Sequence, residues 1–354
     1  MEERIRNIQS KLKSPDMGGI LFFDLTNIRY LVGFTGSAGI LFVGRETAIL
    51  AVDGRYTTQA NSESSGCEII EFRDNITGIA GIISDLQLNS VGFESPAISF
   101  ENYSKLKEKI GPVALEPLSD DFDSLRIIKE RGEIALLKEA ISISADALQG
   151  TLKTIRPGMK ERDIALDLEF RMVKGGGEKP SFETIVASGA NAALPHARPQ
   201  FRRIERGDFV IIDYGVVHKG YHSDETCTLA VGKVTKEQRK IYNVVKDAHD
   251  RALDAVKAGA LCKDVDAEAR NCIEEAGYGQ YFSHGTGHGV GLDVHEAPKI
   301  SRESNCCLEE GMVITIEPGI YIPELLGVRI EDMALVQTDG CEILTKTSKD
   351  LRIL

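Results

Sequence analysis

The sequence has 354 residues, of which 42% are hydrophobic and 27% charged, the composition of a globular protein long enough for two domains. Its 54 acidic residues outnumber its 42 basic residues, and the net charge of −12 argues against nucleic acid or an anionic membrane as a partner. The seven cysteines are scattered, odd in number and form no CxxC pair, so we expect neither a disulfide framework nor a zinc–thiolate site and predict a cytoplasmic protein.

The first third of the sequence predicts a small α/β domain. Residues 1–13 have the pattern of a charged amphipathic helix without the apolar core of a signal peptide, and no segment reaches membrane-spanning length. Apolar runs bounded by Gly or Asp predict strands at 20–23, 39–43, 47–52, 68–72 and 90–93, alternating later with helices near 76–87 and 100–110. The acidic stretch 118–123 is typical of a linker, which predicts domains at 1–123 and 124–354.

The rest of the sequence alternates helical and strand patterns without an evident internal repeat. Apolar residues at helical spacing predict helices at 129–152, 161–173, 235–258 and 264–276. Apolar runs predict strands at 182–187, 209–214, 312–317, 328–337 and 341–345.

The stretch from 284 to 296 holds three of the chain's seven histidines, namely His284, His288 and His295. Glycine fills alternate positions from 285 to 291, which disfavours a helix and predicts an extended segment that comes close to a ligand or another strand. A phosphate loop is disfavoured because no Gly-Lys-Ser/Thr or strand–GxGxxG–helix context surrounds the stretch. Alternatively, the stretch could be a buried glycine-rich segment whose histidines only form hydrogen bonds within the core. Three histidines at spacings of four and seven residues favour metal binding or catalysis instead.

Two pairs of acidic residues lie in apolar strands, where a buried charge requires a reason. A hairpin around 218–219 would put Asp213 and Asp224 directly opposite each other, about 5 Å apart, although a bulge at Gly220 could shift this register by one residue.

A second hairpin, centred on Glu324 with Pro323 and Gly327 as turn residues, would put Glu317 opposite Glu331. A solvated hairpin face explains one such pair, but two pairs and a histidine stretch favour a metal site. Four carboxylates and one imidazole suit manganese or another first-row dication, and four negative charges balance two divalent ions about 3.5–4 Å apart.

With these residues assembled, the chain resembles the pita-bread metallopeptidases over essentially its whole length: methionine aminopeptidase, prolidase (Xaa-Pro dipeptidase) and aminopeptidase P (Xaa-Pro aminopeptidase). The resemblance implies an α/β (α+β) protein, with a small creatinase/prolidase-like N-terminal domain before a C-terminal pita-bread catalytic domain. It implies five metal ligands, Asp213, Asp224, His288, Glu317 and Glu331. It further implies catalytic roles for His196, His295 and Glu317, and substrate contacts for His284, Tyr321, Arg329 and Lys299.

The chain departs from the family pattern at Cys227, where an arginine is usual, so a contact behind the ligands is in doubt. His218, His222 and His249 have no role implied by the resemblance, and His249 is expected to be an ordinary polar residue of a helix. Because creatinase and the histone-chaperone relatives lack the metal set, its completeness here favours a working peptidase.

The resemblance implies a metallo-exopeptidase that uses two divalent ions, manganese first and cobalt or zinc as alternatives, to cleave peptides with proline at the second position. We expect an Xaa-Pro aminopeptidase, because the segments 33–39 and 53–56 resemble aminopeptidase P. A dipeptidase needs a fixed cation for the carboxylate after proline, and Lys299 stands where similar prolidases have an arginine. An Xaa-Pro dipeptidase, a methionine aminopeptidase and a non-catalytic peptide-binding protein are the alternatives. A homodimer whose N-terminal domain lines the active-site mouth is also expected.

Overall fold

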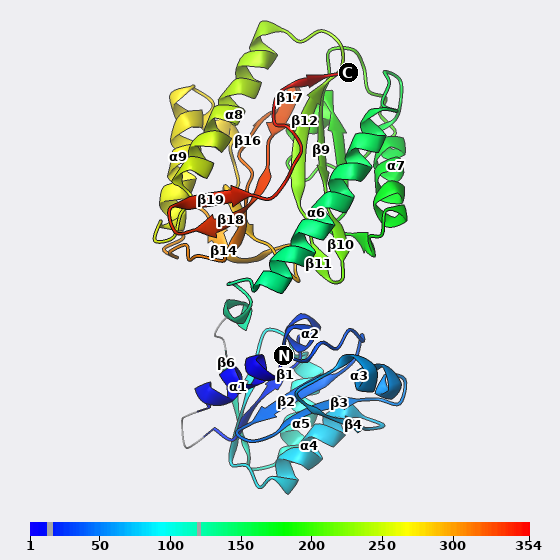
Figure 1. The fold of residues 1–354 in the computed structure, drawn as a ribbon, viewed down its shortest axis with the longest axis vertical. Helices are drawn as coiled ribbons and strands as arrows, with labels where there is room; N and C mark the ends of the chain where they lie inside the picture. Colours follow the sequence, from blue (N-terminus) through cyan, green and yellow to red (C-terminus); the bar gives the residue numbers. More distant parts are fainter. Residues whose placement is uncertain (13–16, 119–121) are drawn as a thin grey trace. The chain divides into compact units, whose positions relative to one another are not determined.

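The computed structural model of the protein describes residues 1–12, 17–118 and 122–354 (Figure 1). The chain divides into two compact units, Met1–Asp123 and Ser124–Leu354. Part of the predicted linker, residues 119–121, and the end of the predicted first helix, Lys13, lie outside the described residues. None of the helices formed by the described residues combines the length and apolar character needed to span a membrane.

The first unit is built on one mixed sheet, with the strand order β4-β3-β2-β1-β5-β6. The central strands are fully buried because each is an uninterrupted apolar run, as predicted. The strands are β1 (Gly19–Phe22), β2 (Ile40–Gly44), β3 (Ala48–Val52), β4 (Glu68–Glu71), β5 (Ser90–Glu94) and β6 (Ala114–Leu118). The helices are α1 (Glu2–Lys11), α2 (Leu25–Val32), α3 (Thr57–Glu63), α4 (Asn75–Asp85) and α5 (Phe100–Ile110).

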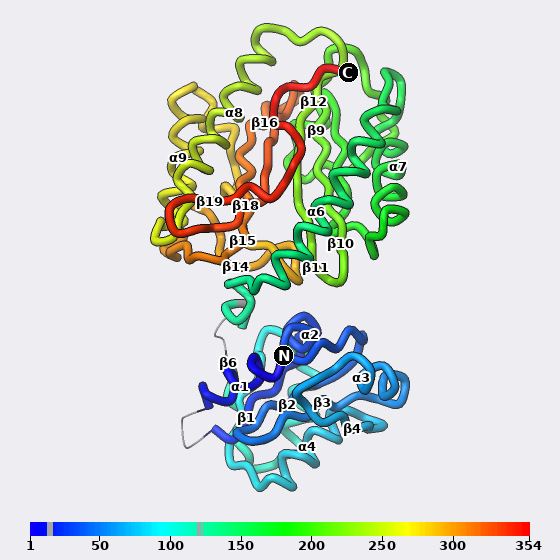
Figure 2. Tube along the Cα trace, viewed as in Figure 1, coloured from blue at the N-terminus to red at the C-terminus, as the bar shows by residue number. Residues whose placement is uncertain are grey.

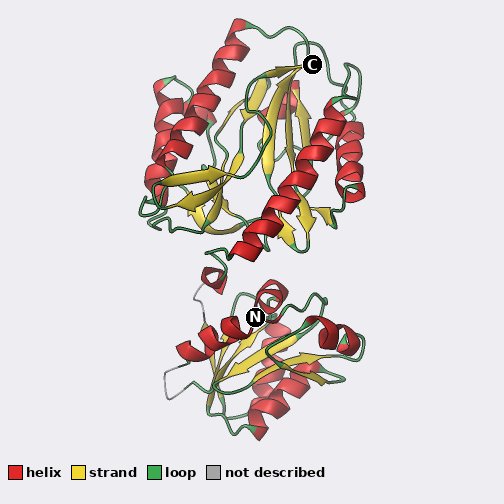
Figure 3. Cartoon of the chain, viewed as in Figure 1, coloured by secondary structure: helices red, strands yellow, loops and turns green. Residues whose placement is uncertain are grey.

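The second unit has helix pairs on two sides of a set of curved strands, as Figures 1 and 3 show. The pairs are α6 (Arg131–Leu152) with α7 (Glu161–Lys174), and α8 (Lys236–Ala255) with α9 (Cys262–Glu275). A short 3-10 helix, η1 (Phe122–Leu125), precedes them, and η2 (Gly189–Ala193) and η3 (Gly279–Tyr281) lie in connections.

The strands between the helix pairs form several sheets. One has the order β20-β12-β9-β8 and another β14-β13-β15-β18-β19, while β11-β10-β7 and β16-β17 are smaller. Their bounds are β7 (Lys179–Pro180), β8 (Ile185–Ser188), β9 (Phe209–Tyr214), β10 (Val216–His218), β11 (Tyr221–His222), β12 (Glu225–Ala230), β13 (Gly287–Gly289), β14 (Glu296–Ile300), β15 (Val313–Ile316), β16 (Gly319–Ile322), β17 (Leu326–Arg329), β18 (Asp332–Gln337), β19 (Gly340–Ile343) and β20 (Arg352–Ile353).

Each helix pair buries its apolar face on a different part of these strands. α6 and α7 form one core with β8, β9 and β12, and α8 and α9 form another with β15, β17 and β18. Figure 2 follows the chain to its C-terminal end, where β20 joins the sheet beside β12. The fold class is therefore as predicted, an α/β domain followed by a pita-bread domain.

The register of the first acidic hairpin differs from the prediction. Asp213 pairs with Thr226 rather than with Asp224, because the two-residue turn consists of Lys219 and Gly220 instead of residues 218–219. Both turn residues have positive φ, 47° and 84°, which is the geometry of a type I′ turn and favours glycine at the second position. The shift is two residues, so Asp224 stays on the same face of the hairpin as Asp213 and lies diagonal to it.

The second acidic hairpin has the predicted register. Gly319 pairs with Arg329 in β16–β17, and Ile316 pairs with Asp332 in β15–β18, which leaves Glu317 and Glu331 facing each other between these pairs. Gly327, however, is no turn residue: it lies in β17, where an added Cβ would come 1.8 Å from the carbonyl oxygen of Ala192. Residues 328–337, predicted as one strand, are split into β17 and β18 at the position of Glu331.

Candidate active site

Acidic and histidine side chains converge at the centre of the second unit. Asp224 precedes β12, His288 lies in β13, and Glu331 joins β17 to β18. Each offers one donor atom, and these three atoms all lie within 4.8 Å of one another. His288 Nε2 lies 3.7 Å from Asp224 Oδ2 and 3.5 Å from Oε1 of Glu317, which follows β15. The cluster thus joins side chains that are up to 107 residues apart in the sequence, since Asp224 and Glu331 stand at its extremes.

The hydrogen bond made by the other ring nitrogen fixes the tautomer of His288. His288 Nδ1 donates to the carbonyl oxygen of Gly289 at 3.0 Å, so Nε2 carries the lone pair when the ring is neutral. Burial lowers the pKa of His288 to about 4, which keeps the ring neutral at pH 7. A lone pair directed at two carboxylates is repulsive unless a cation lies between them.

Arg329 orients Asp213 at the edge of the cluster. Its Nη2 donates to Asp213 Oδ2 at 2.5 Å, and its Nη1 donates to Tyr321 Oη at 2.8 Å and to the carbonyl oxygen of Pro195 at 3.0 Å. Asp213 Oδ1 is buried and has no hydrogen-bond partner among the described residues. One carboxylate oxygen is therefore held by the guanidinium group, and the other is left for a ligand.

Burial and mutual repulsion raise the pKa of the acidic residues. The pKa of Asp224 lies well above its ordinary value, mainly because of desolvation and then because of the negative charges of Glu331, Asp213 and Glu317. The pKa of Glu331 is also raised well above its ordinary value, first by desolvation and then by the negative charges of Glu317 and Asp213. Desolvation also raises the pKa of Glu317 to about 7, partly offset by the positive charge of Arg329. Carboxylates this close together stay ionised at neutral pH only with added positive charge.

Divalent cations fit this set of residues. Hard carboxylate oxygens and one neutral imidazole are ligands that first-row dications accept, and the buried Asp213 Oδ1 has no other partner among the described residues. The donor atoms of Asp224, His288 and Glu331 are close enough to share one ion.

Close packing of β13 explains the alternating glycines. A Cβ added at Gly287 would lie 1.9 Å from the carbonyl oxygen of Thr315, and one at Gly289 would lie 2.1 Å from that of Ala297. Only glycine therefore lets β13 fit between β14 and β15 and bring His288 to the acidic residues. The expectation of a close backbone approach is confirmed.

Three further histidines surround the cluster. The ring of His295 packs against that of His288 with centroids 4.4 Å apart, and His295 remains exposed. His284 Nδ1 donates to the carbonyl oxygen of Gly285, so its Nε2, 2.9 Å from Tyr321 Oη, accepts a hydrogen bond from the tyrosine. His196 is exposed on the segment after η2, and its charge is felt at both His284 and His295.

Lys299 lies at the edge of this arrangement. It is exposed in β14 and is the register partner of His288, so both side chains lie on the same face of the sheet.

The sequence analysis missed residues that hold the ligands from behind. Thr226 is fully buried, donates to Glu331 Oε2 at 2.7 Å and accepts a hydrogen bond from Arg329 Nε at 3.2 Å. The detectable pattern was the alternation of Asp224, Thr226 and Thr228, which places these three polar residues on one face of the extended segment.

Two buried ionic groups hold the segments that carry histidines. Glu161 is fully buried and accepts hydrogen bonds from Ser188, Asn191 and the backbone of Gln200, which bound the segment containing His196. Another group joins Asp266, Arg270 and Thr286, with Arg270 donating to the carbonyl oxygen of His284. The helical spacing of Asp266 and Arg270 could have indicated their ion pair, but no sequence pattern connects them to Thr286 or Glu161 to Ser188, Asn191 and Gln200.

Two residues set aside in the sequence analysis have defined surroundings. His249 is not an ordinary polar residue: it is 1% exposed in α8, and its Nε2 lies 3.2 Å from Asp332 Oδ2, because α8 packs its inner face onto β18. Cys227 is a buried free thiol that belongs to the core beneath α6 and α7.

The two units match two family descriptions. Residues 135–338 match metallopeptidase family M24, and residues 4–128 match the creatinase/prolidase N-terminal domain.

Similar proteins extend over the whole chain. An Xaa-Pro dipeptidase of Pyrococcus horikoshii is 38% identical over 99% of both chains. The solved structure of an Xaa-Pro dipeptidase from Bacillus anthracis has a TM-score of 0.96 and 41% identity, covering 99% of both chains. An X-Pro aminopeptidase from Thermotoga maritima has a TM-score of 0.91 and 35% identity, covering 100% of this chain and 99% of its own. The chain therefore belongs to metallopeptidase family M24, with a creatinase/prolidase N-terminal domain, and is a peptide-hydrolysing enzyme.

Proposed function

We propose that this enzyme hydrolyses the peptide bond between an N-terminal residue and proline, with two divalent ions held by Asp213, Asp224, His288, Glu317 and Glu331. The observation that carries the proposal is the convergence of four carboxylates, two buried and two half-buried, with one neutral imidazole whose free lone pair faces two of them. The similar proteins named as Xaa-Pro peptidases support proline at the second position of the substrate.

Divalent ions bound at this set would supply Lewis acidity and would lower the pKa of a bound water. Glu317 is the general base, because its carboxylate lies inside the cluster, with Oε1 3.5 Å from His288 Nε2, within reach of a water held there. His295 and His196 are exposed beside the cluster and stabilise negative charge that develops on the substrate carbonyl. Tyr321, fixed by Arg329 and His284, orients the substrate.

We further propose that Xaa-Pro dipeptides are the preferred substrates. The names of the Pyrococcus and Bacillus relatives favour this candidate, and Lys299 offers a positive charge on the face of His288 for the carboxylate that follows proline. The expected aminopeptidase activity is the second candidate. It is supported by the Thermotoga relative and by a cavity of about 380 Å³ that could hold further residues, lined without charged side chains by Ala193, Pro195, Gln280, Tyr281, Ser283, Tyr321 and Pro323.

A peptide panel with added manganese tests both candidates. We expect Ala-Pro to be cleaved with a higher kcat/KM than Ala-Pro-Ala, and Lys299→Ala to lower kcat/KM for Ala-Pro selectively. A higher kcat/KM for Ala-Pro-Ala, unaffected by the substitution, would establish the aminopeptidase instead. Cleavage of Met-Ala without a preference for proline would indicate a methionine aminopeptidase, and binding without turnover a non-catalytic protein.

The remaining proposals concern the state of the enzyme. Manganese is the proposed native metal because the ligands are mostly carboxylates. We also propose a cytoplasmic homodimer and a domain boundary between residues 123 and 124, where the chain divides into its two compact units. Sedimentation of the metal-loaded enzyme at working concentration tests the dimer, which an active monomer would contradict.

A further inference from the structure

A second pair of buried carboxylates lies directly behind the metal ligands. Glu225 follows Asp224, and Asp332 follows Glu331, so each ligand has an acidic neighbour in the chain. Consecutive residues of an extended segment project to opposite faces, which turns these neighbours away from the ligand cluster. Glu225 is 1% exposed and Asp332 is 4% exposed, so neither charge is solvated by water.

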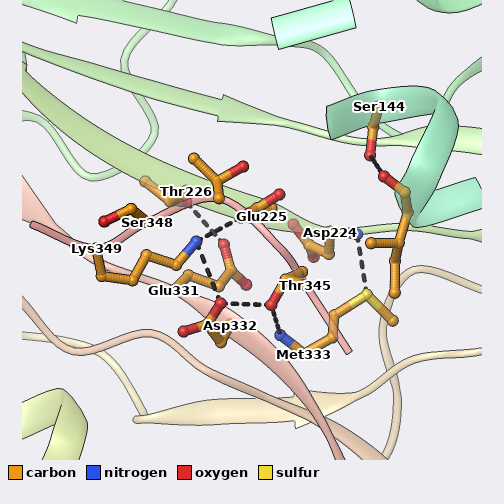
Figure 4. A network of polar contacts seen from close by, with 12 residues as sticks. Ser144, Asp224, Glu225, Thr226, Glu331, Asp332, Met333, Thr345, Ser348 and Lys349 are labelled. Carbon is orange, nitrogen blue, oxygen red and sulfur yellow. Dashed lines mark hydrogen bonds and ion pairs between the residues drawn. The ribbon is translucent and has the colours of Figure 1, made fainter. Parts of the chain in front are cut away.

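The ammonium group of Lys349 joins the two carboxylates (Figure 4). Its Nζ lies 2.5 Å from Glu225 Oε1 and 3.2 Å from Asp332 Oδ1, and its side chain is 8% exposed. The carboxylates have further partners: Tyr214 donates to Glu225 Oε2 at 2.7 Å, and the hydroxyl of Thr345 donates to Asp332 Oδ1, the oxygen that Lys349 also contacts. The other oxygen of Asp332, Oδ2, lies 3.2 Å from His249 Nε2. Lys349 is therefore the cation that links the segment of Asp224 to the segment of Glu331.

The C-terminal segment fixes the backbone of Lys349. Tyr242 of α8 donates to the carbonyl oxygen of Lys349 at 3.0 Å, and β20 pairs in parallel with β12 three residues later. Cys227, the next residue on the Glu225 face of β12, is a buried neutral thiol and supplies no positive charge. The charge behind β12 therefore comes from a residue outside the strands that carry the ligands.

Removing this cation would alter the position of the ligands, because the two strands are coupled. The backbone N–H of Glu331 donates to the carbonyl oxygen of Thr226 at 3.1 Å, so the two segments are direct neighbours. A displacement of one segment relative to the other therefore changes the separation of Asp224 and Glu331. Without Lys349, Glu225 would lose its ion pair and Asp332 would keep only His249, so the two buried carboxylates would repel each other and the acidic cluster more strongly.

We propose that Lys349 is a positioning residue for the metal centre: by neutralising Glu225 and Asp332 it holds Asp224 and Glu331 at the spacing that a shared ion requires. This inference rests on the proposed metal site. It assigns a role in metal binding to a residue that contacts neither substrate nor metal ligand.

The test measures manganese binding to the metal-free full-length protein by titration calorimetry. Lys349→Met, which keeps the length of the side chain without its charge, is expected to weaken binding about 10- to 100-fold, as is usual for residues that support ligands. The triple variant Lys349→Met/Glu225→Gln/Asp332→Asn, which also removes the stranded charges, is expected to recover most of that affinity. Lys346→Met is the matched control, because Lys346 lies exposed on the same segment, and it should bind manganese like the wild type.

Unchanged affinity of a folded Lys349→Met variant would overturn the inference. If that variant does not fold, the triple variant decides: folding with near-normal affinity supports neutralisation, and failure to fold or to bind manganese contradicts it. Failure of the proposed metal site gives a different result. In that case the Asp224→Asn substitution would not reduce the binding of manganese to the protein. A wild type that binds at Asp224 and a Lys349→Met variant that binds equally well would refute the inference alone.

Discussion

At the scale of single residues, the site combines groups whose burial is unfavourable until a cation binds. Asp224, Glu317 and Glu331 all have raised pKa values because of desolvation and their mutual repulsion, while the pKa of His288 is lowered by desolvation. The folded protein maintains this arrangement through hydrogen bonds to the same side chains. Thr226, between Glu331 and Arg329, is the clearest example.

We predict that Thr226→Val weakens manganese binding about 10- to 100-fold, because Glu331 loses the hydrogen bond that orients its carboxylate. The substitution keeps the shape of the side chain but leaves buried polar atoms unpaired, which costs about 1–3 kcal/mol of folding free energy. Calorimetric titration of metal-free protein with manganese, together with thermal unfolding, measures both effects.

Thr228→Val provides the comparison. Thr228 lies two residues further along β12 and is also buried. Among the residues that the structure describes, its hydroxyl exchanges hydrogen bonds only with the backbone of Arg329, at 2.8 and 3.1 Å. It should lower the stability similarly but leave the metal affinity unchanged. Equal losses of affinity in the two variants would mean that Thr226 acts through the strand and not through Glu331.

The ligand candidates could be named from the sequence because an acid in an apolar strand requires a partner, and Asp213 and Glu317 each follow such a run. Thr226 and Lys349 could not be. Threonine is an ordinary strand residue, and the ion pair of Lys349 with Glu225 spans 124 positions with no periodicity to reveal it. Such pairings depend on how strands and the C-terminal segment meet in three dimensions.

At the scale of elements, the turn between β10 and β11 sets the relation between Asp213 and Asp224. The positive φ angles of Lys219 and Gly220 make it a type I′ turn, whose twist matches that of the paired strands. The existence of this hairpin could be predicted from the sequence but its register could not, since His218-Lys219 and Lys219-Gly220 both allow two-residue loops. The second hairpin was predicted correctly in register, while the close contact of Gly327 with Ala192 was not, because it joins β17 to the distant η2.

We predict that Gly220→Ala destabilises the protein, lowering its free energy of unfolding by about 1–2 kcal/mol, because alanine is strained at a φ of 84°. The loss corresponds to a decrease in Tm of about 2–8 °C for a unit of this size. Lys219→Asn should leave Tm unchanged or higher, because asparagine adopts the left-handed conformation more readily than lysine. Differential scanning calorimetry measures both variants, and an unchanged Tm for Gly220→Ala would contradict the type I′ geometry.

At the scale of the whole molecule, part of the net charge of −12 is concentrated in one buried cluster, so bound metal and folding stability are linked. The pKa of Glu317 is about 7 in the folded protein, above its ordinary value of 4.5, and those of Asp224 and Glu331 also lie well above their ordinary values. The folded metal-free protein therefore holds these protons more tightly than the unfolded chain. The contribution of Glu317 to stability is fully present below pH 4.5 and is lost as the pH rises through 7, and the contributions of Asp224 and Glu331 are likewise lost with rising pH.

We predict that Tm of the metal-free protein falls between pH 7 and 8.5, and that the increase in Tm caused by manganese is larger at pH 8.5 than at pH 7. Histidine titration contributes little to the change in Tm between pH 7 and 8.5. The pKa of His284 and of His288 is lowered from 6.5 to about 4, so the stability that these residues gain with rising pH is nearly all gained below pH 7. Metal binding adds to the difference because its carboxylate ligands must be deprotonated.

Scanning calorimetry of chelator-treated and manganese-loaded protein at both pH values measures these changes in Tm. Glu317→Gln removes one titrating group and should reduce the fall in Tm of the metal-free protein by the contribution of that group. Between pH 7 and 8.5 this contribution is only about 0.4 kcal/mol of unfolding free energy, because most of it is already lost between pH 4.5 and 7. A metal-free Tm that rises from pH 7 to 8.5, or a Glu317→Gln variant with an unchanged slope, would show that the cluster is not protonated in the folded protein. The acidic residues would then be held apart by compensating positive charge other than bound metal.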